Sequence, residues 1–152
     1  MIRRFGRPPG SVTQWRRRPG AYAILTRGRR VLLTVQATDE GPDVQLPGGG
    51  IDPGESPLPA LLREVREETG HTARIARHVG AFREFRWMPE YRIHAEKICH
   101  VYLGQVGLRL GPPSEPDHTV MWCTPREARD RLASAGGRAA LTHWLLRSGR
   151  MS

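Results

Sequence analysis

Cysteine, lysine and long hydrophobic runs are all scarce in this 152-residue sequence, and each absence narrows the kinds of protein it can encode. The two cysteines, Cys99 and Cys123, lack the Cys-x-x-Cys spacing of zinc sites and redox pairs, so we expect reduced, buried thiols. No apolar stretch approaches the length of a membrane span, and the basic N-terminus lacks the apolar core of a secretory signal. We therefore expect a cytoplasmic globular protein rather than a disulfide scaffold or a membrane protein.

Positive charge dominates the composition, and almost all of it is arginine. The formal net charge is +9 and the isoelectric point is about 11.1, with Lys97 as the sole lysine. Arg3-Arg4 and Arg16-Arg17-Arg18 concentrate this charge near the N-terminus, beside Trp15, which could stack on a base. Such a surface favours anionic partners such as nucleotides or RNA, whereas a solvated arginine-rich tail explains the same residues without nucleic acid. The sequence leaves both interpretations open.

Length and turn signals predict one domain that mixes strands and helices. A chain of this length can bury one core. We expect residues 1–20 to form a basic, partly irregular segment and residues 21–148 to form the domain. Strands are expected at 21–26, 30–37, 44–46, 73–87, 96–106 and 119–123, with helices at 57–69, 124–135 and 138–147. Loops are expected at 38–42, 88–95 and 107–117, a helix break is expected at Gly136-Gly137, and Trp122 is expected to pack against the last helix.

The segment from Gly49 to Gly70 is the most informative part of the chain. Ser56 suits a helix N-cap, Pro57 suits the first helical position, and Gly70 suits the position just past the end. These signals predict a helix over 57–69. Its apolar residues recur at i, i+3, i+4 and i+7, which predicts one buried stripe formed by Leu58, Leu61, Leu62 and Val65.

Three glutamates, Glu64, Glu67 and Glu68, share a different face of the same helix. Like charges at this spacing destabilise a helix by about 0.2–0.5 kcal/mol per pair. The helix dipole also disfavours carboxylates in the last turn. A cluster that accepts both penalties indicates bound cations, and carboxylate oxygens suit Mg²⁺ or Mn²⁺. The alternative is a solvated acidic face paired with Arg63 and Arg66.

A glycine-rich loop, Gly48-Gly49-Gly50, immediately precedes this region. Glycines permit close approach of the backbone to a ligand, although a tight turn alone would also explain them. The loop is neither a Walker A motif, which ends in Gly-Lys-Ser/Thr, nor a Rossmann fingerprint, which opens directly into a helix. His94-Ala95-Glu96 resembles part of a zinc deaminase motif, but the Pro-Cys-x-x-Cys partner is missing.

Together the loop and helix resemble the signature of the Nudix (MutT-like) hydrolases. The matching pattern is G-x5-E-x7-R-E-U-x-E-E-x-G-U, where U is aliphatic, and it is carried by Gly49, Glu55, Arg63, Glu64, Glu67, Glu68 and Gly70. One position departs from it, because His71 stands at the final aliphatic position. The resemblance implies an α/β Nudix fold in which a mixed β-sheet is sandwiched between α-helices.

The resemblance also implies roles for individual residues. Glu64, Glu67 and Glu68 would bind Mg²⁺ or Mn²⁺ together with the carbonyl of Gly49 or of adjacent Gly48. Arg63 would orient the glutamates, and Glu55 would support the site through the loop or a water. The general base would be Glu68, or a residue outside the signature, for which Glu96 and Glu90 are the candidates.

The activity that the resemblance implies is metal-dependent hydrolysis of a nucleoside diphosphate linked to another group X. Trp87, Tyr91 and Arg86 are expected to contact the substrate, because aromatic and cationic side chains suit bases and phosphates. Phe82 and Phe85 are expected to pack in the core or a loop. The alternatives are an RNA 5′-end or dinucleoside polyphosphate pyrophosphohydrolase and a non-catalytic nucleotide- or RNA-binding module on the same fold.

Overall fold

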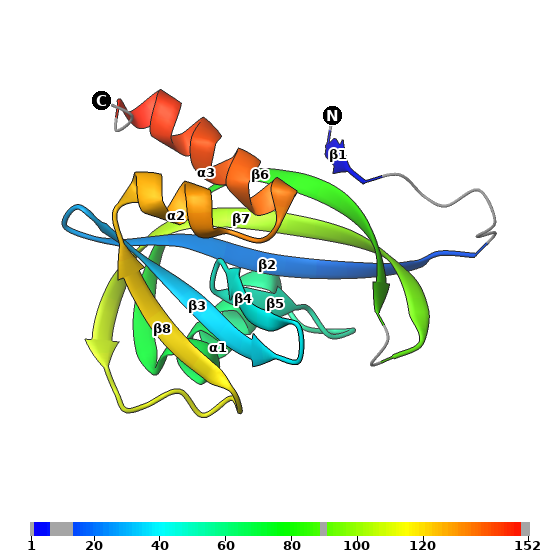
Figure 1. Ribbon diagram of the computed structural model, residues 1–152, viewed down its shortest axis with the longest axis horizontal. Helices are drawn as coiled ribbons and strands as arrows, with labels where there is room; N and C mark the ends of the chain where they lie inside the picture. The colour runs from blue at the N-terminus through cyan, green and yellow to red at the C-terminus, as the bar shows by residue number, and fades with distance from the viewer. Residues whose placement is uncertain (1, 7–13, 89–90, 150–152) are drawn as a thin grey trace.

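The computed structural model describes residues 2–6, 14–88 and 91–149 and contains a mixed sheet with helices on both faces (Figure 1). The sheet order is β1-β6-β7-β2-β3-β4, with β5 paired to β2 and β8 paired to β3. The strands are β1 (Arg3–Phe5), β2 (Arg16–Arg27), β3 (Arg30–Thr38), β4 (Gly41–Gln45), β5 (Gly48–Gly50), β6 (His71–Met88), β7 (Ile93–Arg109) and β8 (His118–Cys123). The helices are α1 (Pro57–Thr69), α2 (Pro125–Arg131) and α3 (Ala135–Ser148).

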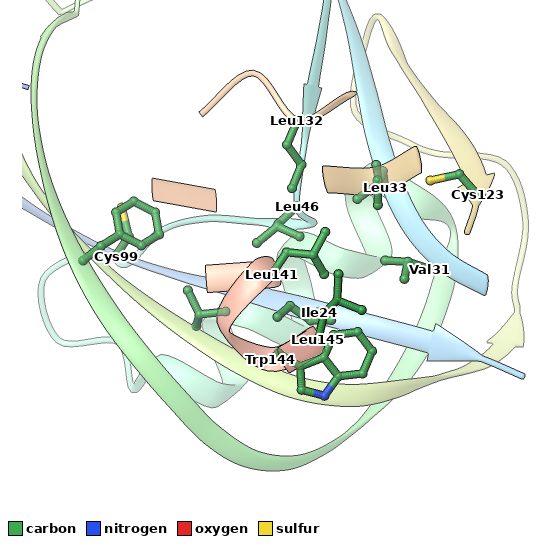
Figure 2. Packing of buried hydrophobic residues seen from close by; sticks show 13 residues of the cluster. Ile24, Val31, Leu33, Leu46, Cys99, Cys123, Leu132, Leu141, Trp144 and Leu145 are labelled. Atoms are coloured by element: carbon green, nitrogen blue, oxygen red, sulfur yellow. The ribbon is translucent and has the colours of Figure 1, made fainter. Parts of the chain in front are cut away.

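Two apolar clusters, one on each face, hold the helices to the sheet. On one face Leu141, Trp144 and Leu145 of α3 pack with Ile24 and Val101 of the central strands (Figure 2). On the other face Leu61 and Val65 of α1 pack on the small β2 residues Ala21 and Ala23. The expected arrangement, a mixed sheet between helices, is confirmed. None of the helices in the described part of the chain is long and apolar enough to cross a membrane.

Helix α1 has the predicted bounds because its end signals are local. Gly70 takes the left-handed conformation with φ of 72°, and its N–H donates to the carbonyl of Arg66. Ser56 occupies the N-cap position but makes no side-chain capping bond. The predicted apolar stripe is only half right, since Leu61 and Val65 are fully buried whereas Leu58 and Leu62 are 43% and 40% exposed.

Non-local pairing changes several other predicted boundaries. Strand β2 begins at Arg16 rather than at residue 21, because residues 16–26 pair in parallel with β7. The expected loop over 38–42 largely belongs to β3 and β4, whose pairing runs from Thr34↔Gln45 to Thr38↔Gly41. Strand β6 ends at Met88 and strand β7 begins at Ile93, so the loop expected at 88–95 is shorter than predicted. Strand β7 then continues to Arg109.

Two predictions about the C-terminal half are wrong. Gly136 and Gly137 do not break the chain but lie in the first turn of α3, whose N-cap Ser134 accepts the N–H of Gly137. Gly136 packs directly on the Phe82 ring, where a Cβ would overlap it. Trp122 packs on the α1 side of the sheet, edge-on to His71 and beneath the Arg27 guanidinium, not against α3.

Candidate functional site

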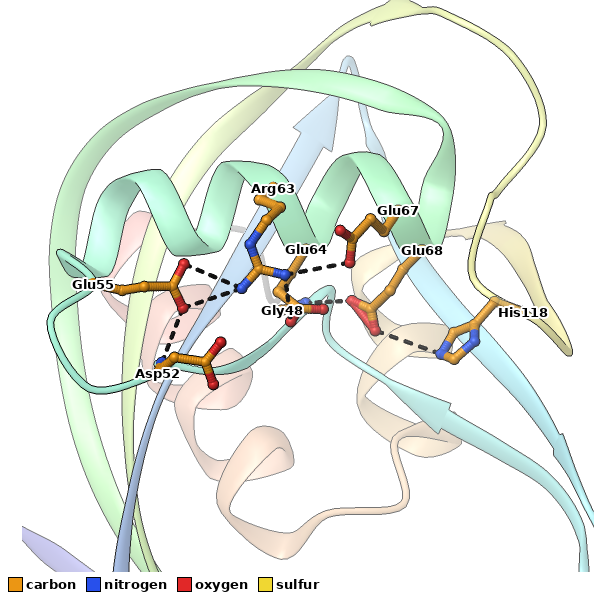
Figure 3. Close-up of polar contacts among 8 residues, drawn as sticks. All are labelled: Gly48, Asp52, Glu55, Arg63, Glu64, Glu67, Glu68 and His118. Carbon is orange, nitrogen blue, oxygen red and sulfur yellow. Dashed lines mark hydrogen bonds and ion pairs between the residues drawn. The ribbon is translucent and has the colours of Figure 1, made fainter.

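Arg63 on α1 joins three of the glutamates that the sequence singles out (Figure 3). Its guanidinium lies 3.2 Å from Glu55, 3.3 Å from Glu64 and 3.4 Å from Glu67. Arg63 and Glu67 are one helical turn apart, and Glu55 reaches the same guanidinium from the preceding loop. A planar guanidinium has several donors in a fixed fork, so one arginine can fix several carboxylates at once. This arrangement draws the loop and the helix into one polar site.

Glu55 is positioned by its own loop as well as by Arg63. The backbone N–H of Asp52 donates to Oε1 of Glu55 at 2.9 Å, and the N–H of Glu55 donates to the carbonyl of Asp52. The backbone N–H of Asp52 and, to a lesser degree, the charge of Arg63 lower the pKa of Glu55 below its usual value. Glu55 is therefore an anion that ties the loop to α1.

Glu68 faces the glycine loop. The backbone N–H of Gly48 donates to Oε1 of Glu68 at 2.8 Å. Gly48 has φ of 143°, and a Cβ there would overlap the carbonyl of Ala21, so no other residue fits this backbone. At Gly49 a Cβ would lie 2.8 Å from the carboxylate carbon of Glu64. The missing side chain of Gly49 lets Glu64 lie directly against the loop backbone, and that of Gly48 lets the loop lie against β2 while its N–H binds Glu68.

Burial raises the pKa of the two glutamates nearest the loop. Desolvation raises the pKa of Glu68 to about 8, while the Gly48 N–H opposes the rise and the charges of Glu64, Glu115 and Glu67 add to it. Desolvation also raises the pKa of Glu64, against the opposing charge of Arg63. A cation would reverse both penalties, because it favours the charged form of a nearby carboxylate. Hard oxygen donors of this kind fit Mg²⁺ or Mn²⁺.

The carboxylates are not arranged as a closed metal cage. Within the described ranges, no group of three or more His, Cys, Asp or Glu side chains is placed to hold a metal ion together. Glu64 and Glu67 are drawn to Arg63, and Glu68 is drawn to Gly48. The chemistry of the donor set thus fits a divalent cation, while Arg63 and the loop bind the carboxylate oxygens in this structure.

His118, at the start of β8, is a site residue that the sequence did not reveal. Its Nε2 lies 3.5 Å from Oε2 of Glu68, and its Nδ1 lies 3.0 Å from the carbonyl of Pro116. A carbonyl only accepts, so Nδ1 carries a hydrogen, and Nε2 and Glu68 must share one further proton to bond. His118 is 50 residues from Glu68 in the chain and belongs to no motif, so no local signal pointed to it.

The other predicted site residues lie on β6, β7 and the turn between them. Glu96 is bound by Arg83 at 3.2 Å and by Arg17 at 3.9 Å, an ion-pair group separate from that of Arg63. Trp87 and Tyr91 are 48% and 56% exposed. Glu90 lies outside the described residues.

Trp87 and Tyr91 each contact another side chain, and Arg86 lines a small cavity. The Trp87 ring lies against the His94 ring, with centroids 4.7 Å apart and planes tilted by 48°, and Tyr91 lies beneath the Arg18 guanidinium. Arg86 borders a cavity of about 20 Å³, room for roughly one water, together with Tyr22 and Lys97. Phe82 is buried in the α3-side core, as expected, and Phe85 is half-buried against Trp15.

Comparison with known proteins adds a family model and several relatives. The model for the NUDIX domain matches residues 16–145. A CTP pyrophosphohydrolase of Escherichia coli is 29% identical over 109 residues, covering 70% of this chain and 75% of its own length. An RNA pyrophosphohydrolase of a Nitratiruptor species is 46% identical over 59 residues, covering 36% of this chain and 38% of its own length.

A solved structure supports the same grouping. The MutT NUDIX hydrolase from Burkholderia pseudomallei is 27% identical with a TM-score of 0.60, over 84% of this chain and 97% of that one. The curated relatives are matched over limited stretches, with shares of their own length that run from 29% to 75%.

Proposed function

The chain belongs to the Nudix family, with the domain over residues 16–145, and from this premise we propose that it is a pyrophosphohydrolase. Its reaction is the hydrolysis, dependent on Mg²⁺ or Mn²⁺, of a nucleoside diphosphate linked to another group X. The two relatives described above are named a CTP pyrophosphohydrolase and an RNA pyrophosphohydrolase, which supports the bond that is cleaved. The group X and the metal belong to the proposal.

One observation carries the proposal, namely the carboxylate cluster organised by Arg63 against the glycine loop. Glu55, Glu64 and Glu67 share one guanidinium, while Glu68 is held by the N–H of Gly48. A surface helix that needed only solubility would have no reason to bury Glu68 to 8% exposure. Anionic oxygens concentrated beside an open glycine backbone are what a cation-assisted phosphoanhydride cleavage requires.

The chain's own residues would bind, orient and take up a proton. Glu64, Glu67, Glu68 and the carbonyl of Gly49 would supply the metal-binding oxygens. Bound there, Mg²⁺ or Mn²⁺ would supply positive charge to the anhydride oxygens and acidify the attacking water. Arg63 would hold Glu64 and Glu67 in a fixed orientation beside the loop, and Glu55 would attach the loop to Arg63.

We assign removal of the water proton to Glu68. Its Oε2 lies 3.5 Å from Nε2 of His118, a nitrogen that can take the proton in turn. Glu96, the other described candidate, is bound by two arginines in an ion-pair group separate from that of Arg63.

Substrate contacts outside the cluster are proposed for three residues. Trp87 and Tyr91 expose aromatic rings on which a base can stack, and Arg86 offers a guanidinium to a phosphate. An RNA 5′ end is the second candidate substrate, favoured by the net charge of +9 and by the stretch shared with the Nitratiruptor RNA pyrophosphohydrolase.

A substrate panel tests the proposed reaction. Purified protein is incubated with nucleoside triphosphates, ADP-ribose-like sugars, dinucleoside polyphosphates and 5′-triphosphorylated or capped RNA, with Mg²⁺, Mn²⁺ or EDTA. Turnover of at least one compound that needs the metal and stops in EDTA is expected. Absence of turnover across the whole panel would favour the non-catalytic binding module.

A further inference from the structure

Strands β2, β6 and β7 extend together past the end of the α2–α3 layer (Figure 1). At this end of the helix layer, the contact with the sheet is made by Ser134, the N-cap of α3. Its hydroxyl donates to Oε1 of Glu84 on β6 at 2.7 Å. Beyond that point β7 still has β2 and β6 as its neighbours, with Arg16↔Ala95 and Arg86↔Ala95 as paired positions. This extension presents a sheet face on the α3 side that α2 and α3 leave uncovered.

Strand alternation and register gather four cations on that face. Tyr22, Phe82 and Cys99 point into the α3-side core. Residues an even number of positions away on the same strand point the same way. On β6 and β7 these are the residues two and four positions from Phe82 and Cys99, and on β2 they are Arg18 and Arg16, four and six positions before Tyr22. They form two adjacent rows, Arg18–Lys97–Glu84 and Arg16–Ala95–Arg86. We name Arg16, Arg18, Arg86 and Lys97 the basic strip.

The charge of the basic strip is poorly neutralised. Glu84 and Glu96 are the acidic residues within the three strands. Glu96 lies on the opposite face, where Arg83 and Arg17 bind it. Oε1 of Glu84 accepts from Ser134 and from the N–H of Gly136. Arg16 and Arg86 are exposed, so the strip presents a net positive surface to solvent.

An aromatic ring accompanies the cations. The Arg18 guanidinium lies 4.8 Å from the centroid of Tyr91, and the ring remains 56% exposed. Arginines two residues apart on a strand are about 7 Å apart along it. A line of cations beside an exposed ring is the combination that binds the phosphates and stacks the bases of a single strand. An acidic peptide would use the cations but not the ring.

We propose that the basic strip binds single-stranded nucleic acid, with Arg16, Arg18 and Arg86 on the phosphates and Tyr91 stacked on a base. Lys97, whose Nζ bonds the hydroxyl of Tyr22 at 3.1 Å, adds charge from beneath the surface. Arg86 and Tyr91 are also proposed above as substrate contacts, whereas Arg16 and Arg18 are not, so the variant of these two arginines tests the strip separately from the proposed hydrolysis.

The test is fluorescence anisotropy with labelled single-stranded RNA, single-stranded DNA of the same length, and a length-matched poly-glutamate, all in EDTA to prevent turnover. The variant Arg16→Ala/Arg18→Ala is compared with a control, Arg74→Ala/Arg77→Ala. The control removes two exposed arginines from the N-terminal half of β6, away from the basic strip. Loss of two phosphate contacts should lower the slope of log K against log salt by about 1.4 for the first variant only. Tyr91→Ala should weaken nucleic-acid binding by about 5- to 100-fold.

Thermal unfolding of each variant is measured to check that the fold is retained. Tighter binding of either oligonucleotide than of poly-glutamate supports the proposal and identifies which nucleic acid is preferred. Equal losses in the two double-arginine variants, or poly-glutamate binding that matches the oligonucleotides together with an inert Tyr91→Ala, would overturn it.

Discussion

The backbone N–H of Gly48 donates a 2.8 Å hydrogen bond to Oε1 of Glu68, joining the glycine loop to the last turn of α1. The bond depends on backbone geometry that only glycine accepts, and it holds the most buried of the three clustered glutamates. Gly48 therefore has a structural role, holding Glu68 against the loop, that is separate from any contact with substrate.

Gly48→Ala should destabilise the protein and reduce turnover together. The φ of 143° and the overlap of a Cβ with the Ala21 carbonyl force the loop backbone to move away from Glu68. Gly41→Ala is the matched control, because Gly41 has φ of 109° but nothing within 4 Å of its added Cβ. Backbone strain alone costs about 1–3 kcal/mol. Urea unfolding should show a larger loss for Gly48→Ala, and an equal loss in the two variants would contradict this account of the loop.

Arg63→Lys should reduce turnover much more than it reduces stability. Lysine keeps the charge but cannot bind Glu55, Glu64 and Glu67 with one fixed fork. Arg63 is 39% exposed, so solvent screens its ion pairs and their contribution to stability is small. Residues that orient metal-binding groups typically contribute about 10- to 100-fold in activity. Arg66→Lys, on an exposed position of the same helix, should be close to neutral in both measurements.

The stability of the metal-free protein should fall between about pH 5 and pH 8 through Glu68. The pKa of Glu68 is about 8 in the folded protein against 4.5 for an unperturbed glutamate. Between these values the folded state binds more protons than the unfolded state, so rising pH lowers the free energy of unfolding. The stabilisation is complete below about pH 4.5 and lost as pH rises through 8. Urea titrations in EDTA should show this slope, and Glu68→Gln should flatten it.

Local signals explain which parts of the fold could be read from the sequence. The bounds of α1 followed from Pro57 at its start and Gly70 at its end, both of which act within one turn. The start of β2 at Arg16 could not be read in this way, because it depends on pairing with β7, about 80 residues away. The sequence predicts a break at Gly136, because the role of this glycine, clearance for the Phe82 ring, is visible only in the packed structure.

The same distinction between local signals and distant pairing applies to the residues of the candidate site. Its glutamates, Arg63 and the glycine loop lie within one short segment whose spacing is informative by itself. His118 comes to Glu68 only through the pairing of β8 with β3, and Glu96 is drawn to Arg83 and Arg17 by the pairing of β7 with its neighbours. The proposed roles of these residues remain predictions that mutagenesis must test.

The most direct measurement is the turnover of a substrate found with the panel, in saturating Mg²⁺ or Mn²⁺, for Glu67→Gln and Glu68→Gln. Glu40→Gln, in an exposed turn, is the matched control. Removal of a metal-binding carboxylate should lower turnover by about 100-fold or more, beyond the loss typical of supporting residues. Glu40→Gln should retain full activity, and thermal unfolding should show all three variants folded. Full activity in both Glu67→Gln and Glu68→Gln would contradict the assignment of this cluster as the catalytic site.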